Sequence, residues 1–577
     1  MKEEVIKKDH SEDEASSHTL YEYEKVYESF SWKSFEKEYI REDGTLNAAY
    51  AAVDRHIGTW RKNKVALIFE DDAGTVEKFT FEELSTFSNK VGNILKDFGA
   101  QRGDRIFLFL PRIPYLYISF LAVLKIGSVA GALFSAFQEQ ALFDRLENSG
   151  ASIVLTTSDL LPRFDTIKKK LPELRHIITV DTDDFKKSIE KASDDLHIAR
   201  TRPDDHAFML YTSGTTGKPK GIVHAHRAIL HQAMSARYVL DLKEEDTFWC
   251  TADPGWITGI SYEILGNLAL GVTTLVYSGR FDPKRWYALI QEHKITVWYT
   301  APTAIRMLMG AGLESVREYD HSSLRHLSSV GEPLNPGAIR WSMKAFGKPF
   351  HDTWFQTETG AIMIANFAML DIRIGSMGKP LPGIVANIVD DEGRQVEDGT
   401  EGNIALKPGW PAMMQTVWKR LSKYHSYFTN GWYMSGDRGM RDKDGYFWFI
   451  ARADDVIKTA GERVWPFEVE SALVEYPGVI EAGVIGKPDE LRGEIIKAFV
   501  VLDKTQSAKR KTQKDKEKLK IELMEYVKKH LAGHAYPREI EFIDSLPKTR
   551  SGKIMRRILK AKELGLPVGD TSTLEEY

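Results

Sequence analysis

Cysteine is nearly absent from the 577-residue sequence, in which Cys250 is the single cysteine. One thiol excludes an intramolecular disulfide framework and a zinc site built from several cysteines. The sequence also lacks an excess of charge of either sign. It contains 78 lysines and arginines and 82 aspartates and glutamates, which gives a formal net charge of -4. This balance gives no indication of nucleic acid or a membrane surface as a partner. The charged amino terminus carries no apolar signal segment, so we expect a cytoplasmic protein.

Uninterrupted apolar runs of membrane-spanning length are lacking as well. The most apolar segment, residues 113–137, contains Pro114, Lys125, Gly127 and Gly131. A membrane-spanning helix needs about 20 consecutive apolar residues. The segment therefore predicts a buried helix followed by a strand. The length of the chain predicts roughly two to four domains.

Strand-like and helix-like patterns alternate from residue 65 onward. Thr80 and Glu83 form a capping box at the start of a helix, whose apolar residues recur at helical spacing up to Gly99. Strands are predicted at residues 65–69, 105–110, 152–155 and 176–180. Such alternation is typical of an α/β fold whose layers contain largely parallel sheets.

A change of pattern near residues 452–455 indicates a domain boundary. The sequence after it predicts a smaller α+β domain, with strands at 481–485 and 495–501 and a helix that carries Leu519 and Leu523 on one face. The first 20 residues are polar with charges of both signs, which predicts a flexible tail. We therefore expect a tail at 1–20, a large domain of layered α/β subdomains at 21–453, and a smaller domain at 454–577.

Two segments indicate phosphate chemistry. Residues 211–221 read Tyr-Thr-Ser-Gly-Thr-Thr-Gly-Lys-Pro-Lys-Gly, in which glycines let backbone N–H groups approach phosphate, hydroxyls donate hydrogen bonds and lysines add charge. The spacing is not that of a Walker A loop, because two residues separate the glycines and a proline follows Lys218. Residues 546–554 carry a second basic group, Lys553. A phosphate loop with a remote lysine favours an enzyme that activates a carboxylate with ATP.

Residues 211–221 resemble the signature of the adenylate-forming superfamily, which includes acyl-CoA synthetases, adenylation domains of peptide synthetases and luciferases. Other segments resemble motifs of the superfamily in the same order: residues 330–334, 352–360, 435–437, 452–457, 461–463 and 546–554. Within the superfamily, the closest resemblance is to the acetyl-CoA synthetase family. It is carried by residues 47–50, 251–259, 484–489 and 547–557. The resemblance extends from about Tyr21 to the end of the sequence.

This resemblance implies a two-step reaction that uses ATP, Mg²⁺ and CoA. The carboxylate is first transferred to the α-phosphate of ATP, which gives an acyl-adenylate and pyrophosphate, and the thiol of CoA then displaces AMP. Charge that develops on the phosphoryl oxygens requires fixed cations and N–H donors. Lys553 is implied to bridge the carboxylate and the α-phosphate, and Thr357 to contact the α-phosphate. Glu358 is implied to bind Mg²⁺, for which one carboxylate is enough because the ion keeps several waters.

The resemblance also implies a nucleotide site. The residues implied to hold the β- and γ-phosphates are Thr212, Ser213, Gly214, Thr215, Thr216, Gly217, Lys218 and Lys220. The residues implied to lie around the adenine are Gly331, Glu332, Pro333, Asp352, Thr353 and Trp354. Asp437 is implied to accept hydrogen bonds from the ribose hydroxyls, with help from Arg452. Core packing for Trp354 and a turn aspartate for Asp437 are the ordinary structural alternatives.

In families of this kind the smaller domain is mobile, so it closes over the large domain and later withdraws the lysine. Asp454 resembles the hinge residue of this motion. Gly461 is implied to line the tunnel for the pantetheine of CoA, and Arg463 to contact phosphate or steady the closed domain. An ordinary loop residue remains the alternative for each. Members of the family are often switched off by acetylation of the lysine that matches Lys553, which removes its charge, so the resemblance implies a lysine acetyltransferase and a deacetylase as regulatory partners.

The acyl pocket implied by the resemblance consists of Trp256, Ile257, Thr258, Val330 and Phe355. These side chains are apolar or small, and the absence of a carboxylate among them disfavours an amino acid as substrate. Acetyl-CoA synthetases usually carry a second tryptophan where this chain has Phe355, so the floor of the pocket is expected to be deeper. One methylene changes discrimination by about 1–3 kcal/mol. We therefore expect acetate and propionate as substrates.

Three alternatives stay open at the level of sequence. The first is a CoA ligase for a longer or branched acid, which Phe355 favours. The second is an adenylation enzyme that loads a carrier protein. The third is a non-catalytic sensor or scaffold, against which the combination of Glu358, Asp437 and Lys553 argues.

Overall fold

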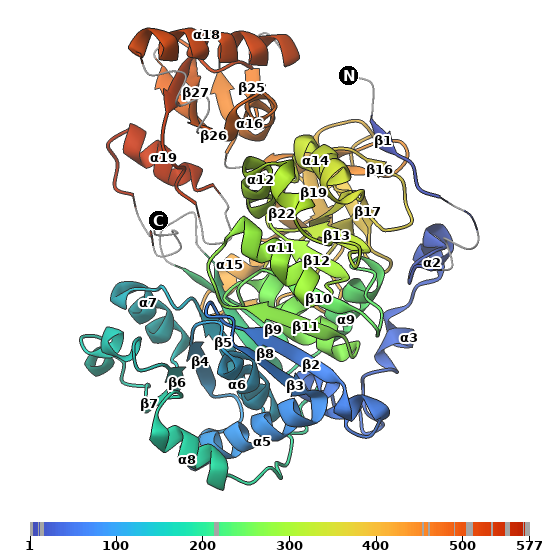
Figure 1. The fold of residues 1–577 in the computed structure, drawn as a ribbon, viewed down its shortest axis with the longest axis vertical. Helices are drawn as coiled ribbons and strands as arrows, with labels where there is room; N and C mark the ends of the chain where they lie inside the picture. Colours follow the sequence, from blue (N-terminus) through green and yellow to red (C-terminus); the bar gives the residue numbers. More distant parts are fainter. Residues whose placement is uncertain are drawn as a thin grey trace.

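The computed structural model describes residues 4–9, 11, 17–212, 219–452, 455–459, 462–489, 491–503, 512–531, 535–548, 554–568 and 571, without the side chains of Arg463 and Gln513. They form a large α/β part and a smaller carboxyl-terminal part, which lies next to α12 and α14 of the large part (Figure 1). The predicted α/β fold, with a large amino-terminal and a smaller carboxyl-terminal domain, is confirmed.

A seven-stranded sheet has the strand order β20-β9-β8-β5-β4-β6-β7. Its central pairs are parallel, and β8 and β9 form an antiparallel hairpin. The strands are β4 (Arg105–Phe109), β5 (Val129–Leu133), β6 (Ile153–Thr156), β7 (His176–Thr179), β8 (His206–Thr212), β9 (Lys220–Ala225) and β20 (Thr416–Val417). The helices in this part of the chain are α5 (Phe81–Asp97), α6 (Pro114–Lys125), α7 (Glu139–Ser149), α8 (Asp183–Lys191) and α9 (Ala228–Tyr238).

Local sequence signals explain several of these elements. The side chain of Thr80 accepts the N–H of Glu83, and the Glu83 side chain accepts the N–H of Thr80, which is the predicted capping box of α5. Residues 113–137 form the buried helix α6 and the buried strand β5, as predicted. Strands β4, β5, β6 and β8 are mostly apolar and buried, as expected for strands that are covered on both faces.

A nine-stranded sheet has the order β17-β15-β14-β13-β12-β10-β11-β2-β3, with six parallel strands from β14 to β2. Its strands are β2 (Val65–Glu70), β3 (Val76–Thr80), β10 (Thr247–Cys250), β11 (Thr273–Tyr277), β12 (Val297–Thr300), β13 (His326–Ser329), β14 (Phe350–Trp354), β15 (Ile364–Ala365) and β17 (Lys379–Pro380). The accompanying helices are α10 (Gly266–Ala269), α11 (Pro283–Glu292), α12 (Pro302–Ala311), α13 (Leu313–Arg317) and α14 (Pro336–Phe346). Because β13 and β14 are parallel neighbours, the loops that follow Ser329 and Trp354 leave the sheet at the same edge.

A third, antiparallel sheet contains β18 (Ala386–Val389), β19 (Gly402–Leu406), β21 (Phe428–Thr429), β22 (Trp432–Arg441) and β23 (Phe447–Arg452). The short helix α15 (Leu421–His425) precedes β21. The register of β22 and β23 places Asp437 opposite Arg452. This pairing brings together two residues that the sequence assigned to one site.

The smaller part has its own apolar core, which includes Val469, Leu473, Val484, Ile496 and Leu523. Its strands are β24 (Ile457–Thr459), β25 (Glu462–Val464), β26 (Val479–Asp489), β27 (Gly493–Leu502) and β28 (Glu539–Phe542). Its helices are α16 (Pro466–Val474), α18 (Gln513–His530) and α19 (Arg556–Glu563). The predicted strands at 481–485 and 495–501 lie in β26 and β27, and the predicted helix is α18.

The described residues of the amino-terminal segment contact the large part. Strand β1 (Val5–Ile6) pairs with β16 (Ile372–Arg373) of the large part. His18 Nδ1 lies 2.9 Å from Oδ2 of Asp241, and Leu20 is buried in the main core. These contacts tie the segment to the large part, ahead of α2 (Tyr23–Ser29), α3 (Trp32–Glu36) and α4 (Ala48–Ala52).

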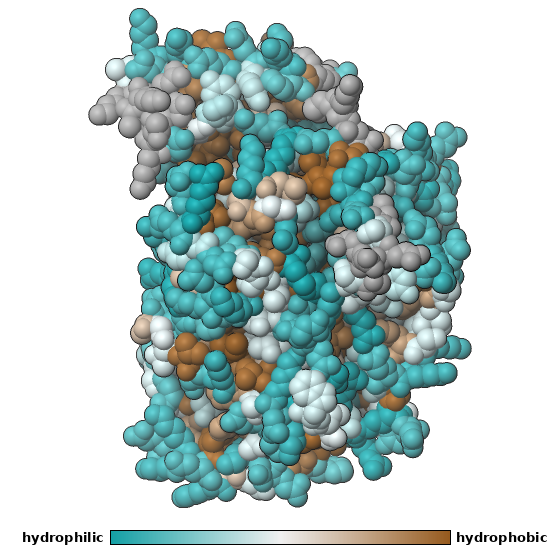
Figure 2. All heavy atoms as spheres, turned by 45° about the vertical axis from the view of Figure 1, so that its right-hand side comes forward, coloured by the Kyte–Doolittle hydropathy of each residue, from teal (hydrophilic) through white to brown (hydrophobic). Residues whose placement is uncertain are grey.

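The outer surface is largely hydrophilic on the face drawn in Figure 2, with hydrophobic residues in separate small patches. Large exposed apolar side chains such as Trp60 and Leu421 come from distant elements. Among the residues described by the structure, no helix combines the length and apolarity that crossing a membrane requires.

Candidate active site

The β8–β9 hairpin positions the phosphate segment. Thr212 at the end of β8 is the antiparallel partner of Lys220 at the start of β9. The Oγ1 atom of Thr212 is buried and has no hydrogen-bond partner among the described residues. Buried hydroxyls are usually hydrogen-bonded, so this atom suits an added donor or acceptor such as phosphate.

Lys220, Tyr427 and Glu358 form a cluster beside this hairpin. The Nζ of Lys220 donates to Oη of Tyr427 at 3.0 Å, and Oη donates to Oε1 of Glu358 at 2.8 Å. The Lys220 and Glu358 charges are 3.9 Å apart, with side chains 16% and 14% exposed. Burial lowers the pKa of Lys220, an effect that Glu358 opposes, whereas burial and Glu358 both raise the pKa of Tyr427. Tyr427 therefore stays protonated and links a cation from the hairpin to a carboxylate from the loop after β14.

A second cluster surrounds Asp437 on β22. The indole N–H of Trp354 and the amide N–H of Gln356 donate to Oδ2 of Asp437 at 3.0 and 2.9 Å. The Nε of Arg452 lies 3.3 Å from Oδ1. The hydroxyl of Tyr433 donates to Oε1 of Gln356 at 2.8 Å, which sets the orientation of the amide. Asp437 is thus a buried carboxylate that is oriented by two hydrogen-bond donors and by the positive charge of Arg452. In this environment it can accept further hydrogen bonds from hydroxyl groups.

The loop that follows β13 contains Gly331, Glu332 and Pro333. Gly331 has a φ of +97°, which favours glycine and turns the chain away from the strand. The carboxylate of Glu332 accepts a hydrogen bond from Thr303 at 2.5 Å and one from Arg306 at 3.0 Å. Glu332 is therefore held by α12, and the backbone of the loop is exposed at Gly331.

Asp352 and Thr353 are tied into the sheet. The Oδ2 atom of Asp352 accepts the N–H of Leu334 at 3.4 Å, and burial raises the pKa of Asp352 to about 8. The hydroxyl of Thr353 donates to the carbonyl of Ser329 at 2.7 Å and lies 2.8 Å from the hydroxyl of Tyr299. Both residues therefore support the loops of the site from the core side.

The predicted acyl-pocket residues come from three loops. Ile257, Thr258 and Val330 are buried, and the Trp256 ring lies 5.0 Å from the ring of Phe134 between centroids. Trp256 to Thr258 lead directly into the π-helix Gly259–Leu265. π-Helical turns are rare and occur often at functional sites.

Phe355 packs against a side chain of that π-helix. Its ring makes an edge contact with Tyr262 at 5.7 Å between centroids. Tyr262 is fixed in turn, because its hydroxyl accepts the N–H of Ile362 at 2.7 Å and lies 2.8 Å from the hydroxyl of Ser235. Tyr262 is therefore the buried support behind Phe355.

A buried ion pair holds the loop between β10 and the π-helix. Arg112 donates to the carbonyls of Cys250 at 3.4 Å and Thr251 at 3.5 Å and pairs with Glu263. Tyr117 donates to the other oxygen of Glu263 at 2.9 Å. Burial raises the pKa of Glu263 to about 7, against the influence of Arg112. The pair links β10 to the helix that follows the acyl residues.

Several predicted site residues lie outside the described residues and stay predictions. They are Ser213, Gly214, Thr215, Thr216, Gly217, Lys218, Asp454, Gly461 and Lys553, together with the side chain of Arg463. Thr357 is described and half-buried in the loop after β14, one residue before Glu358.

Sequence reasoning missed Tyr427, Gln356 and Arg306. Tyr427 and Arg306 belong to none of the motifs, and Gln356 lies inside a motif segment without an assigned role. The only sequence signal was the position of Gln356 between Trp354 and Glu358.

Comparison with known proteins gives matches over most of the chain. Residues 53–418 match the family model described as AMP-binding enzyme, and residues 468–553 match the AMP-binding enzyme C-terminal domain. An acetyl-coenzyme A synthetase from Bacillus subtilis (strain 168) is 52% identical over 570 residues, which cover 97% of this chain and 98% of the relative. An acetyl-coenzyme A synthetase from Methanothrix thermoacetophila is 41% identical, with coverage of 92% and 85%.

Two solved structures have a similar fold. The anthranilate CoA ligase AuaEII in complex with anthranoyl-AMP is similar with a TM-score of 0.82 at 30% identity, covering 91% of this chain and 98% of that one. The Brucella canis acyl-CoA synthetase is similar with a TM-score of 0.73 at 35% identity, covering 94% of this chain and 99% of that one.

Proposed function

The chain belongs to the AMP-binding enzyme family, and from this premise we propose how its residues carry out the reaction of an AMP-forming short-chain acyl-CoA synthetase. The reaction is that of an acetate–CoA ligase: ATP and acetate give acetyl-adenylate and pyrophosphate, and CoA then displaces AMP. One observation carries the assignment of roles. The Lys220–Tyr427–Glu358 cluster joins the hairpin of the phosphate segment to the loop that follows β14.

The nucleotide lies across the edge where β13 and β14 end. Asp437 accepts hydrogen bonds from the ribose, since its carboxylate is already oriented by Trp354 and Gln356. Lys220 supplies positive charge to the phosphates, together with the N–H groups and hydroxyls of residues 212–218. Gly331, Glu332 and Pro333 form the side of the adenine pocket nearest to α12.

Glu358 fits the role of a magnesium ligand. Mg²⁺ prefers carboxylate oxygens and keeps several waters. Within the cluster, Tyr427 and Lys220 both contact Oε1 of Glu358, and neither of these contacts involves Oε2. When bound, the ion neutralises charge on the phosphates during adenylation. Tyr427 orients the carboxylate, and Thr357 contacts the α-phosphate from the adjacent position.

Lys553 bridges the carboxylate of the acid and the α-phosphate in the first step. Its positive charge offsets the negative charge that develops on the phosphoryl oxygens. We propose that Asp454 is the hinge on which the smaller domain, residues 454–577, moves relative to residues 21–453. Gly461 then lines the path of the pantetheine, and Arg463 contacts phosphate or steadies the closed domain.

The acid is acetate, with propionate as the second substrate. Apolar and small side chains at Trp256, Ile257, Thr258 and Val330 suit a short alkyl group. The buried support of Tyr262 limits how far Phe355 can recede. Control of Lys553 by an acetyltransferase and a deacetylase, and a cytoplasmic setting, remain predictions.

The reaction is tested by product analysis with ATP, Mg²⁺, CoA and an acid. We expect one AMP and one pyrophosphate for each acetyl-CoA formed from acetate. Formation of ADP and phosphate would contradict the AMP-forming route. An adenylate that forms without any CoA thioester would favour an enzyme that loads a carrier protein.

A further inference from the structure

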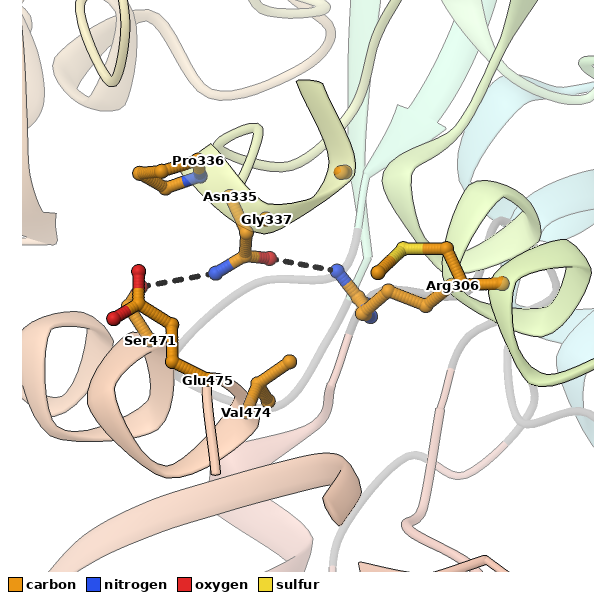
Figure 3. Close-up of a pocket in the computed structure, with 9 residues that line it drawn as sticks. Arg306, Asn335, Pro336, Gly337, Ser471, Val474 and Glu475 are labelled. Atoms are coloured by element: carbon orange, nitrogen blue, oxygen red, sulfur yellow. Dashed lines mark hydrogen bonds between the residues drawn. The ribbon is translucent and has the colours of Figure 1, made fainter. Parts of the chain in front are cut away.

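A small cavity of about 30 Å³, room for a water molecule or two, lies where the two parts of the molecule meet. Its walls come from α12, from the start of α14 and from α16 (Figure 3). Asn335 lies between the two parts: its Nδ2 donates to the hydroxyl of Ser471 at 2.9 Å, and its Oδ1 accepts from Arg306 at 3.2 Å. Asn335 is 8% exposed and Arg306 is 7% exposed, so the hydrogen bond between them is buried, whereas Ser471 is half-buried.

Arg306 connects Asn335 to the nucleotide loop. It donates to Glu332 at 3.0 Å and to Thr303 at 2.6 Å. Burial alone would lower the pKa of Arg306, but the carboxylates of Glu332, Glu481 and Glu470 raise it. Two of these three carboxylates belong to the smaller part. The guanidinium is therefore attracted from both sides of the junction.

On the other side, α16 is tied to the chain that flanks residues 549–553. Glu470, next to Ser471, accepts two hydrogen bonds from Arg556 at 2.8 and 2.6 Å. Lys548 donates to both oxygens of Glu481 at 2.9 and 3.0 Å. The described residues at both ends of the 549–553 segment are thus fixed to the surface that faces Arg306.

Lys548 and Ile554 also pair with each other across this segment, and the N–H of Met555 donates to the carbonyl of Pro547 at 2.8 Å. These contacts join the two ends to each other, and Arg556 joins them to α16. A change in the position of α16 relative to the nucleotide loop changes the position of these ends as well.

We propose that Asn335 and Ser471 are positioning residues for the adenylation step, because their hydrogen bond holds α16, and with it the described ends of the 549–553 segment, next to the nucleotide loop. This inference rests on the proposed role of Lys553. The bond joins a residue at the nucleotide loop to a residue of the smaller part, so a rotation that separates these two surfaces would break it. A reaction step that takes place in another arrangement of the two parts is not accelerated by this hydrogen bond.

The test compares the two half-reactions in the full-length protein. Ser471→Ala removes the bond and leaves the nucleotide loop untouched. Acetate-dependent ATP–pyrophosphate exchange is expected to fall about three- to tenfold, the effect of losing one hydrogen bond. Formation of acetyl-CoA from supplied acetyl-adenylate and CoA is expected to stay within about twofold, as is the KM for ATP. Ser471→Thr, which retains the hydroxyl, is expected to restore exchange.

Glu475→Ala is the matched control. Glu475 caps the same helix and also spans the two parts, through Arg340 at 3.4 Å, but this pair is 38% and 43% exposed. Exposed ion pairs contribute little, so exchange is expected to stay within about twofold. The double variant Asn335→Ala/Ser471→Ala is expected to be no slower in exchange than Asn335→Ala alone, because both changes remove the same bond.

Unchanged exchange in Ser471→Ala would overturn the inference, and so would an equal loss in both half-reactions, which indicates general structural damage. Absence of exchange in the unaltered protein with every acid would overturn the proposed function as well. The two failures are therefore distinguishable.

Discussion

Removal of a single hydroxyl, by Tyr427→Phe, tests the cluster that we place at the phosphates. The hydroxyl donates to Glu358 at 2.8 Å and accepts from Lys220 at 3.0 Å. Tyr427 also stacks on Tyr433 at 5.8 Å between centroids, a contact that phenylalanine retains. The substitution therefore removes hydrogen bonds and keeps the packing.

The magnitude follows from the charge of the partners. Hydrogen bonds to charged groups contribute about 1.5–3 kcal/mol. Each 1.36 kcal/mol corresponds to a factor of 10, so loss of the bond to Glu358 predicts a decrease of about 10- to 100-fold in kcat/KM for ATP. We expect the concentration of Mg²⁺ needed for half-maximal activity to rise, because the carboxylate is less well oriented.

The assay is steady-state kinetics with acetate and CoA saturating and with ATP and Mg²⁺ varied. Tyr424→Phe is the matched control, since Tyr424 lies three residues earlier and burial alone raises the pKa of its hydroxyl, for which no hydrogen bond is found among the described residues. Its kcat/KM is expected to stay within about twofold. A Tyr427→Phe variant as active as the unaltered protein would refute the reasoning.

Other predictions concern the acid, pH and stability. Phe355→Gly is expected to extend the acids accepted toward longer chains, and an unchanged acid profile would show that Phe355 is not the floor of the pocket. Burial raises the pKa of Asp352 from 3.8 to about 8. The folded protein therefore holds this proton more tightly than the unfolded chain, so the contribution of Asp352 to stability is complete below about pH 4 and is lost as the pH rises toward 8. Asp352→Asn is expected to raise the melting temperature relative to the unaltered protein more at pH 8 than at pH 5, and a constant difference would contradict this. Lys548→Met leaves Glu481 buried without its partner, where the two side chains are 5% and 6% exposed. Loss of about 3–5 kcal/mol in the free energy of unfolding of the smaller part is expected by denaturant titration. Lys284→Met, at an exposed pair, is the control and is expected to cost less than about 1 kcal/mol.

The sequence predicted best where one local signal decides the structure. Thr80 and Glu83 lie three residues apart, so their capping box is readable without the fold. The apolar segment 113–137 is interrupted by proline, lysine and glycine residues that mark the ends of its elements. It forms α6 and β5 as expected. The motifs also named both Asp437 and Arg452, which the β22–β23 register then brings together.

Prediction failed where contacts join distant parts of the chain. The bond between Asn335 and Ser471 spans 136 residues and depends on how the two parts are arranged. Strand β1 has only Val5 and Ile6 as apolar residues, too short a pattern to stand out in a polar segment. Tyr427 belongs to no motif and acquires its role from the neighbours that the fold gives it.

The most direct test of the central claim is acid-dependent ATP–pyrophosphate exchange, measured from acetate to octanoate with the unaltered protein and with Lys553→Ala. The account predicts exchange that is greatest with acetate or propionate and lost in the variant, because adenylation requires the lysine. Greatest exchange with longer acids would move the function to a medium-chain ligase. Exchange that persists in Lys553→Ala, or no exchange with any acid, would contradict the account.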